Sequence, residues 1–177
     1  YVLLTKKGPK FFADTAINQD PTAERVAEIA VQAAELVKRM NIEPSIALLS
    51  YSNFGSSDGK TPKKMRDALH ILHENHPDLT VDGEMQANFA VDKDQLKEQF
   101  PFSDLVGSPP NIFIFPGLSS ANIGYKLLQS MAGMEAVGPL LIGLDYPAHV
   151  LQWGADVRQI VNTTAMAVVD AQPREPR

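Results

Sequence analysis

The sequence contains no cysteine, and this absence removes several kinds of chemistry at once. Disulfides, cysteine-ligated zinc, iron–sulfur clusters and thiol nucleophiles are all excluded. Aromatic residues are also scarce, at 7% of 177 residues. Hydrophobic residues nevertheless make up 44% of the chain, and a chain of this length buries a core without a disulfide or a structural metal. We therefore expect one globular domain.

Long hydrophobic runs and an excess of positive charge are missing too. No apolar stretch approaches the roughly 18 residues of a membrane-spanning helix, so we expect no membrane partner. The formal net charge is -5, whereas proteins that bind nucleic acid cluster lysine and arginine, so we expect no nucleic-acid partner. No targeting segment is visible, and we expect a cytoplasmic location. The chain opens at Tyr1 inside an apolar run, and we interpret it as part of a longer polypeptide.

Short apolar runs alternate with segments of helical periodicity, which is typical of an α/β fold with a mostly parallel sheet flanked by helices. A hairpin or two short strands are expected in the first 13 residues, around Gly8-Pro9. Asp20 is the expected N-cap of the first long helix, with Pro21 as its first residue. We predict further strands at 45–50, 79–81 and 111–115, a strand and turn at 137–144, and helices at 22–40, 61–76, 91–100, 119–132 and 157–170.

Open parallel sheets bind ligands beyond the carboxyl ends of their strands, so we expect function in the loops after residues 50, 84, 115 and 144. The first of these loops contains Gly59-Lys60-Thr61. A nucleotide-binding phosphate loop requires glycine five positions before Gly59, where this chain has Phe54. Two interpretations of the loop stay open: an anion site at a helix N-terminus, or a plain surface loop.

Histidine and carboxylate spacing gives no metal site and no catalytic set. His70, His73 and His76 drift around one predicted helix, so we expect them to face solvent and predict no metal. His149 lies in a separate loop and stays a candidate ligand contact. For Asp82-Gly83-Glu84 we predict a structural role, with carboxylates that accept backbone amides. The sequence contains no nucleophile elbow.

Several short segments occur in an order that matches a known family. They are Ala13-Asp-Thr-Ala-Ile-Asn18, Pro21-Thr-Ala-Glu24, Leu48-Leu-Ser50, Asp82-Gly-Glu84, Ile114-Phe-Pro116, Ala121-Asn-Ile-Gly-Tyr-Lys126 and Gly138-Pro139. Together they resemble the C-terminal half of phosphate acetyltransferase. The resemblance implies a two-lobed fold like that of isocitrate and isopropylmalate dehydrogenases, with coenzyme A between the lobes. This chain would then supply strands of the lobe junction (1–14), the second lobe (15–132), elements that return to the first lobe (133–172) and a frayed tail (173–177).

The active pattern of that family is not present. Active phosphate acetyltransferases carry Ser-Arg-Gly-Cys and, four residues later, an aspartate. The aspartate takes the proton of the coenzyme A thiol, the arginine binds phosphate or coenzyme A, and the serine supports the transition state. A neutral amide accepts no proton there and an indole carries no positive charge, so the resemblance implies no acetyl transfer and no catalytic residues. At the serine, arginine, cysteine and aspartate positions this chain has Gln152, Trp153, Ala155 and Gln159.

The C-terminal region also resembles one branch of the family. The segments 149–152, 157–161 and 167–172 are similar to the C-terminal domain of bacterial hybrid NADP-dependent malic enzymes. In these proteins a malic enzyme domain is joined to a transferase-like domain that lacks transferase activity and acts in regulation, with acetyl-CoA as inhibitor. The resemblance therefore implies a regulatory domain that senses acetyl-CoA and has no cofactor of its own. NADP and a divalent metal are expected only in an N-terminal malic enzyme domain of the same chain.

The resemblance also implies the ligand contacts and the partners. Regulation between distant sites favours a domain at subunit contacts, so we expect a homodimer or higher oligomer. The helices at 119–132 and 22–40 are candidate packing surfaces, although covering the sheet is favoured for the second. Two other functions stay open: an active phosphate acetyltransferase that uses other residues, and a nucleotide-binding module. The expected contacts to acetyl-CoA or coenzyme A are Ser50, Ser52, Asn53, Gly55, Ser56, Asn122, Lys126, His149 and Gln152.

Overall fold

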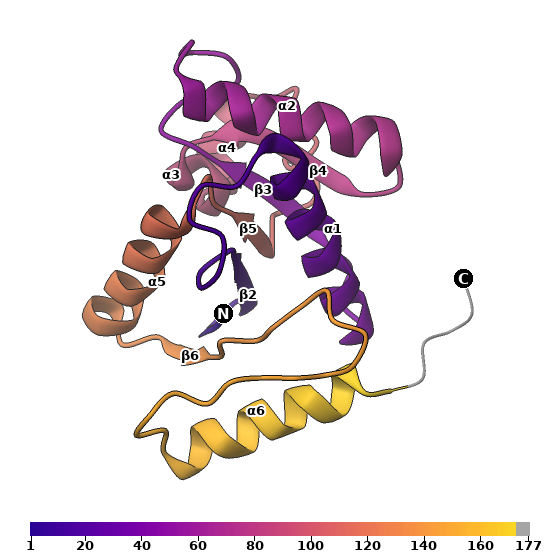
Figure 1. Cartoon of the computed structure of the whole chain (residues 1–177). Helices are drawn as coiled ribbons and strands as arrows, with labels where there is room; N and C mark the ends of the chain where they lie inside the picture. The colour runs from indigo at the N-terminus through magenta and orange to yellow at the C-terminus, as the bar shows by residue number, and fades with distance from the viewer. Residues whose placement is uncertain (173–177) are drawn as a thin grey trace.

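The computed structural model describes residues 1–172 and contains a six-stranded mixed sheet (Figure 1). Its spatial order is β4-β3-β5-β2-β1-β6. The pairs β4–β3, β3–β5 and β5–β2 are parallel, and β1 pairs antiparallel with both β2 and β6, so the predicted mostly parallel sheet is confirmed. The strands are β1 (Val2–Thr5), β2 (Gly8–Ala13), β3 (Ser45–Leu49), β4 (Thr80–Met85), β5 (Ile112–Ile114) and β6 (Glu135–Val137).

Helices cover both faces of the sheet, because successive strand residues point to opposite sides. Ile46 and Leu48 of β3 pack in the cluster under α1 and α2, whereas Ala47 and Leu49 pack in the cluster that contains residues of α3 and α4. Tyr125 of α5 packs with Leu3 of β1 in a third, smaller cluster. The helices are α1 (Ala23–Arg39), α2 (Lys60–Asn75), α3 (Ala87–Val91), α4 (Lys93–Gln99), α5 (Leu118–Ala132) and α6 (Val157–Asp170).

Most predicted elements are confirmed, and the corrections have local causes. The N-cap of α1 is Thr22 rather than Asp20, because the Thr22 hydroxyl accepts the amide of Arg25 at 3.3 Å. Pro21 therefore precedes the helix, and the Asp20 carboxylate instead lies 2.7 Å from Lys64. The helix predicted at 91–100 is confirmed as α4 with narrower bounds, Lys93–Gln99, whereas the short helix α3 before it was not predicted. Asp92 caps a new helix at this point by accepting two backbone amides, which separates α3 from α4.

Two strands differ from their predicted lengths. β4 runs on to Met85 and so includes Asp82-Gly83-Glu84, whereas β6 ends at Val137. Pro139 has no amide hydrogen to continue the ladder of β6. The expected tail at 173–177 lies outside the described residues. Within the described part of the chain, no helix is long and apolar enough to cross a membrane.

The chain after β6 follows a long irregular path before it forms α6. Figure 1 shows it running towards the C-terminal end of α1 and then returning below the sheet. Arg39 at the end of α1 pairs with Asp170 at the end of α6, so the two helices meet at their last residues. α6 thus attaches to the sheet domain mainly through one end and through β6.

Candidate functional site

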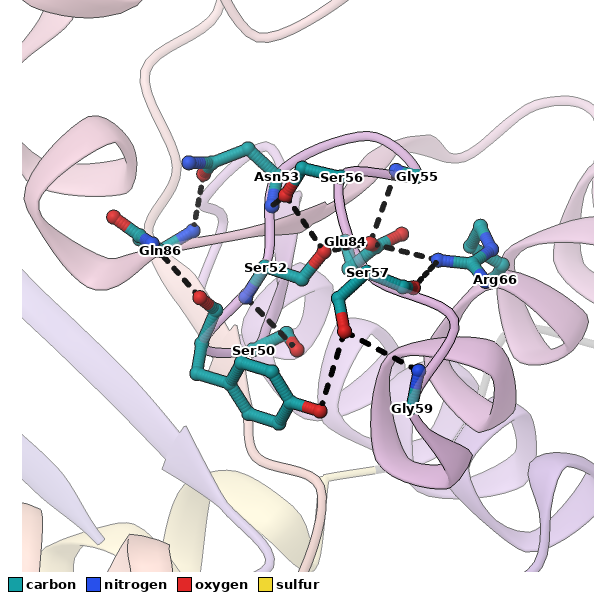
Figure 2. A network of polar contacts seen from close by, with 11 residues as sticks. Ser50, Ser52, Asn53, Gly55, Ser56, Ser57, Gly59, Arg66, Glu84 and Gln86 are labelled. Carbon is teal, nitrogen blue, oxygen red and sulfur yellow. Dashed lines mark hydrogen bonds and ion pairs between the residues drawn. The ribbon is translucent and has the colours of Figure 1, made fainter.

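The loop from Ser50 to Gly59 follows β3 at the carboxyl edge of the parallel strands and is fixed to the end of β4 (Figure 2). The amide of Ser50 donates to the carbonyl of Met85 at 2.8 Å, and the amide of Phe54 donates to the carbonyl of Glu84 at 2.7 Å. Between these bonds the backbone turns sharply, with φ of 45° at Phe54 and 88° at Gly55. Here we call residues 50–59 the β3 loop.

The side chain of Glu84 lies beneath the β3 loop and is fully buried. Its Oε1 atom accepts three hydrogen bonds: from the Ser52 hydroxyl at 2.7 Å, the Gly55 amide at 3.1 Å and the Arg66 guanidinium at 2.9 Å. Arg66 also donates to the carbonyl of Ser57 at 3.1 Å, so it joins α2 to the far side of the loop. The prediction that this carboxylate accepts backbone amides is confirmed.

Five predicted ligand contacts come together in the β3 loop, but their exposure differs. The Ser52 hydroxyl is buried and bonds to Ser56, and the Ser56 hydroxyl accepts the amide of Asn53. The Asn53 side chain accepts the amide of Gln86 at 2.7 Å, which joins the loop to the N-cap of α3. Gly55 and Ser56 are exposed and face solvent at the tip.

The loop after β2 lies at the same edge of the sheet, since β2 runs parallel to β5. Asp14 begins it, and its carboxylate accepts the amides of Ala16, Ile17 and Asn18. Burial raises the pKa of Asp14, but these hydrogen bonds outweigh burial and hold the pKa below its usual value. Asn122, a predicted contact on α5, donates to the carbonyl of Thr15 at 3.3 Å.

Sequence reasoning missed the loop after β2 as a site element. The first 13 residues resemble a hairpin, and this pattern does not show that β2 also pairs in parallel with β5. A cavity of about 280 Å³ lies between this loop, α1 and residues 139–144. Its walls are largely apolar, and polar groups from Asp14, Thr15, Asn18 and Arg25 stand among them. Arg66 was missed as well, and only the buried carboxylate of Glu84 indicates that a cation is needed there.

Histidine-based metal binding finds no support in residues 1–172, which hold no group of three or more histidine and carboxylate side chains suited to a metal ion. The His70 side chain is exposed beside Glu74, and the exposed His73 contacts the carbonyl of Val81. The expectation that His70 and His73 face solvent is confirmed, whereas His76, at the C-cap of α2, is half-buried.

The sequence matches the phosphate acetyl/butaryl transferase family over residues 1–168. The chain belongs to this family. It is 46% identical to an NADP-dependent malic enzyme of Haemophilus influenzae over 96% of its own length, and 39% identical to a phosphate acetyltransferase of Clostridium acetobutylicum over 94%. The crystal structure of a phosphotransacetylase from Streptococcus pyogenes superposes with a TM-score of 0.89 at 38% identity over 96% of this chain.

The chain spans only part of each of these relatives. It covers 22% of the malic enzyme, 50% of the acetyltransferase and 52% of the superposed phosphotransacetylase chain. It thus matches a minor part of the malic enzyme and about half of the two transferases.

The family positions that the resemblance assigned to catalysis lie in and before α6, apart from the β3 loop. Trp153 is fully exposed, and Gln152 donates to the hydroxyl of Tyr1 at 2.6 Å. Gln159 belongs to the capping box of α6: its Oε1 accepts the amide of Asp156 at 3.0 Å. The side chain at the position of the family's base therefore stabilises a helix terminus.

His149 and Lys126 have different surroundings. The His149 side chain is 2% exposed; its Nδ1 accepts the amide of Leu141, and its Nε2 lies 3.9 Å from Asp170. Because Asp170 also pairs with Arg39, His149 lies near the C-terminal end of α1, at the opposite end of that helix from the loop after β2. Lys126 is exposed on α5, over the ring of Tyr125. The predicted ligand contacts of the β3 loop therefore lie close to one another, whereas His149 lies apart from them.

Proposed function

We propose that this chain is a regulatory domain of a malic enzyme polypeptide, that it binds acetyl-CoA and that it does not transfer the acetyl group. One observation carries the claim that no acetyl group is transferred: the side chain of Gln159 is engaged in the capping box of α6. An amide in that bond provides no base for a thiol, and loss of a general base alone costs a factor of about 10² to 10⁴ in rate. The exposed indole of Trp153 provides no positive charge for phosphate.

The ordered β3 loop supports ligand binding. It presents Gly55 and Ser56 at the carboxyl edge of the sheet, where α/β proteins hold their ligands. Asn122, next to the loop after β2, adds a side-chain amide along the same edge. The Ser56 hydroxyl and the Asn122 side-chain amide suit a ligand with many acceptors, such as the phosphates and amides of acetyl-CoA, whereas the Gly55 amide is already bonded to Glu84.

The proposal includes the parent protein. Similarity to malic enzymes over 22% of their length supports an N-terminal malic enzyme domain that holds NADP and a divalent metal. Similarity to about half of the phosphotransacetylase chain supports a two-lobed cleft in which residues 15–132 form the second lobe and residues 133–172 return to the first. Self-association through α5 is supported by its exposed stripe of Ile123, Leu127 and Met131. Such an enzyme works in the cytoplasm.

A working phosphate acetyltransferase is the second candidate, and its support is the 39% identity to a protein of that name. This candidate requires a carboxylate and a guanidinium from elsewhere to reach the thiol of coenzyme A. Two such groups beside Gln159 are already engaged: Asp156 accepts the amide of Gln159, and Arg158 pairs with Glu135 at 2.7 Å.

A thermal-shift titration of the intact polypeptide tests the binding part. Acetyl-CoA at about 100 times its dissociation constant stabilises the binding domain by about 2.7 kcal/mol and raises the melting temperature. ATP serves as the control and leaves the melting temperature unchanged. A shift with ATP alone would favour a nucleotide-binding module, and no shift with acetyl-CoA would refute the proposal. Malate oxidation in the same sample falls when acetyl-CoA binds.

A further inference from the structure

We propose that Glu84 is a positioning residue, whose buried carboxylate sets the shape of the β3 loop before any ligand binds. The inference rests on the proposed function, because it concerns the same loop. Glu84 lies in the buried C-terminal part of β4 and touches the loop from below, where ligand does not reach it. Its effect on binding is therefore indirect and acts through Ser52 and Gly55 (Figure 2).

The β3 loop needs such support because its backbone is strained. Phe54 is a bulky residue with a φ of 45°, in the left-handed region, and a conformation of this kind costs on the order of 1 kcal/mol or more. Gly55 follows at 88°, where glycine is tolerated. Its amide donates to Glu84 Oε1 at 3.1 Å directly after this turn, so the carboxylate holds the chain where the backbone itself favours other shapes.

The influence of Glu84 extends to the exposed tip through a chain of hydroxyl groups. Ser52 donates to Oε1, its oxygen lies 3.0 Å from the hydroxyl of Ser56, and Ser56 accepts the amide of Asn53. Asn53 is in turn fixed to Gln86. A change at Glu84 therefore displaces side chains that it does not touch.

The bonding of the carboxylate is one-sided, which argues against a role in stability alone. Oε1 accepts three donors, whereas the buried Oε2 has no hydrogen-bond partner among residues 1–172. A buried charge with one oxygen unpartnered is a poor stabiliser, and well-packed apolar residues often replace buried ion pairs at no loss. The ion pair with Arg66 compensates the charge from one side and also fixes the carbonyl of Ser57.

The test compares Glu84→Gln with Asp82→Asn in the intact polypeptide. Asp82 lies on the same strand, but its carboxylate accepts the Ser103 hydroxyl and the Asp104 amide, on another loop. Glu84→Gln keeps the shape of the side chain and removes the charge that three donors share. We expect faster amide exchange at Phe54 and Gly55 without ligand, and a dissociation constant for acetyl-CoA about tenfold higher if one loop in ten remains preformed. Asp82→Asn leaves both values near those of the unmodified protein.

Binding is measured well below the melting temperature of both variants, where a purely structural role leaves affinity unchanged. An unchanged dissociation constant for Glu84→Gln, or an equal rise for Asp82→Asn, would overturn the inference. Arg66→Met provides an independent test if Glu84→Gln does not fold. Because Glu84 and Arg66 act as one unit, the variant with both substitutions has a dissociation constant for acetyl-CoA no higher than that of the weaker-binding single variant. Additive losses of binding free energy would contradict the pairing.

The two proposals fail in different ways. If the unmodified protein does not bind acetyl-CoA, the proposed function is wrong, and the exchange of the Gly55 amide still decides whether Glu84 orders the loop. If the protein binds acetyl-CoA and Glu84→Gln exchanges at the unmodified rate, the proposed function stands and the positioning role is wrong.

Discussion

The helices α1 and α6 are of similar length but are held in different ways. α1 buries eight of its 17 residues against the sheet and α2, whereas Thr163 is the one buried residue among the 14 of α6. Apolar side chains of α6 are instead exposed, among them Val157 at 77% and Val161 at 58%. α6 depends on its ends and on polar contacts with β6: the capping box, the pair of Arg39 with Asp170, and Glu135.

This difference bears on the positions that the resemblance assigns to catalysis. These positions lie within residues 152–159, in the exposed part of the chain, whereas the β3 loop, although its tip is exposed, rests on the fully buried Glu84. We therefore expect substitutions in this exposed segment to cost little unfolding free energy. The predicted ligand contacts of the β3 loop, in contrast, are coupled to the core through Glu84 and β4.

Truncating one apolar residue in each helix gives the largest expected contrast. Ile29→Ala in α1 removes a core side chain that is 6% exposed and costs about 2–4 kcal/mol of unfolding free energy. Ile160→Ala in α6, where the residue is 43% exposed, costs less than about 1 kcal/mol. Urea denaturation of both variants measures the difference. Equal losses would mean that α6 is packed as tightly as α1.

Breaking the contact between the two helix ends gives a smaller effect that is confined to α6. Asp170→Asn removes the negative partner of Arg39, and both side chains are partly buried. We expect the free energy of opening α6 to fall by about 1–2 kcal/mol, measured as faster amide exchange along α6 with slow exchange retained in α1. Asp67→Asn breaks the exposed pair with Lys63 and is the control, with a change within about 0.5 kcal/mol. Uniform acceleration in both helices would contradict local attachment.

The turn before α1 gives the smallest effect, and it depends on pH. The folded pKa of Asp14 lies below its unfolded value, so its ionised form stabilises the fold above about pH 4, and this stability is lost as pH falls through the folded pKa. Asp14→Asn keeps one acceptor oxygen and costs about 1 kcal/mol at pH 7. The difference from the unmodified protein shrinks towards pH 3 in urea denaturation. A constant difference across this range would show that the ionised carboxylate is not responsible.

The sequence predicts the fold better than it predicts the site, for physical reasons. Apolar runs such as 45–50 and 111–115 form buried strands because their side chains are apolar on both faces of the sheet and are stable only away from water. The helix predicted at 157–170 matches the bounds of α6. A cap depends on one or two hydrogen bonds, so Thr22 rather than Asp20 caps α1, and Asp92 sets the start of α4 at Lys93 rather than at residue 91.

The site depends on contacts between residues that are far apart in the sequence. The family motif indicates the β3 loop, but periodicity does not show that Arg66 reaches Glu84 or that the Ser52 hydroxyl turns inward. The capping box of Gln159, in contrast, was missed although the sequence signals it, because Asp156 precedes the predicted helix start and Gln159 follows three residues later.

Assay of the intact polypeptide with acetyl phosphate and coenzyme A tests the central claim most directly, with acetyl-CoA binding measured on the same sample. The account predicts saturable binding of acetyl-CoA together with acetyl-CoA formation no faster than in a blank without protein. Formation that rises in proportion to protein concentration would contradict it.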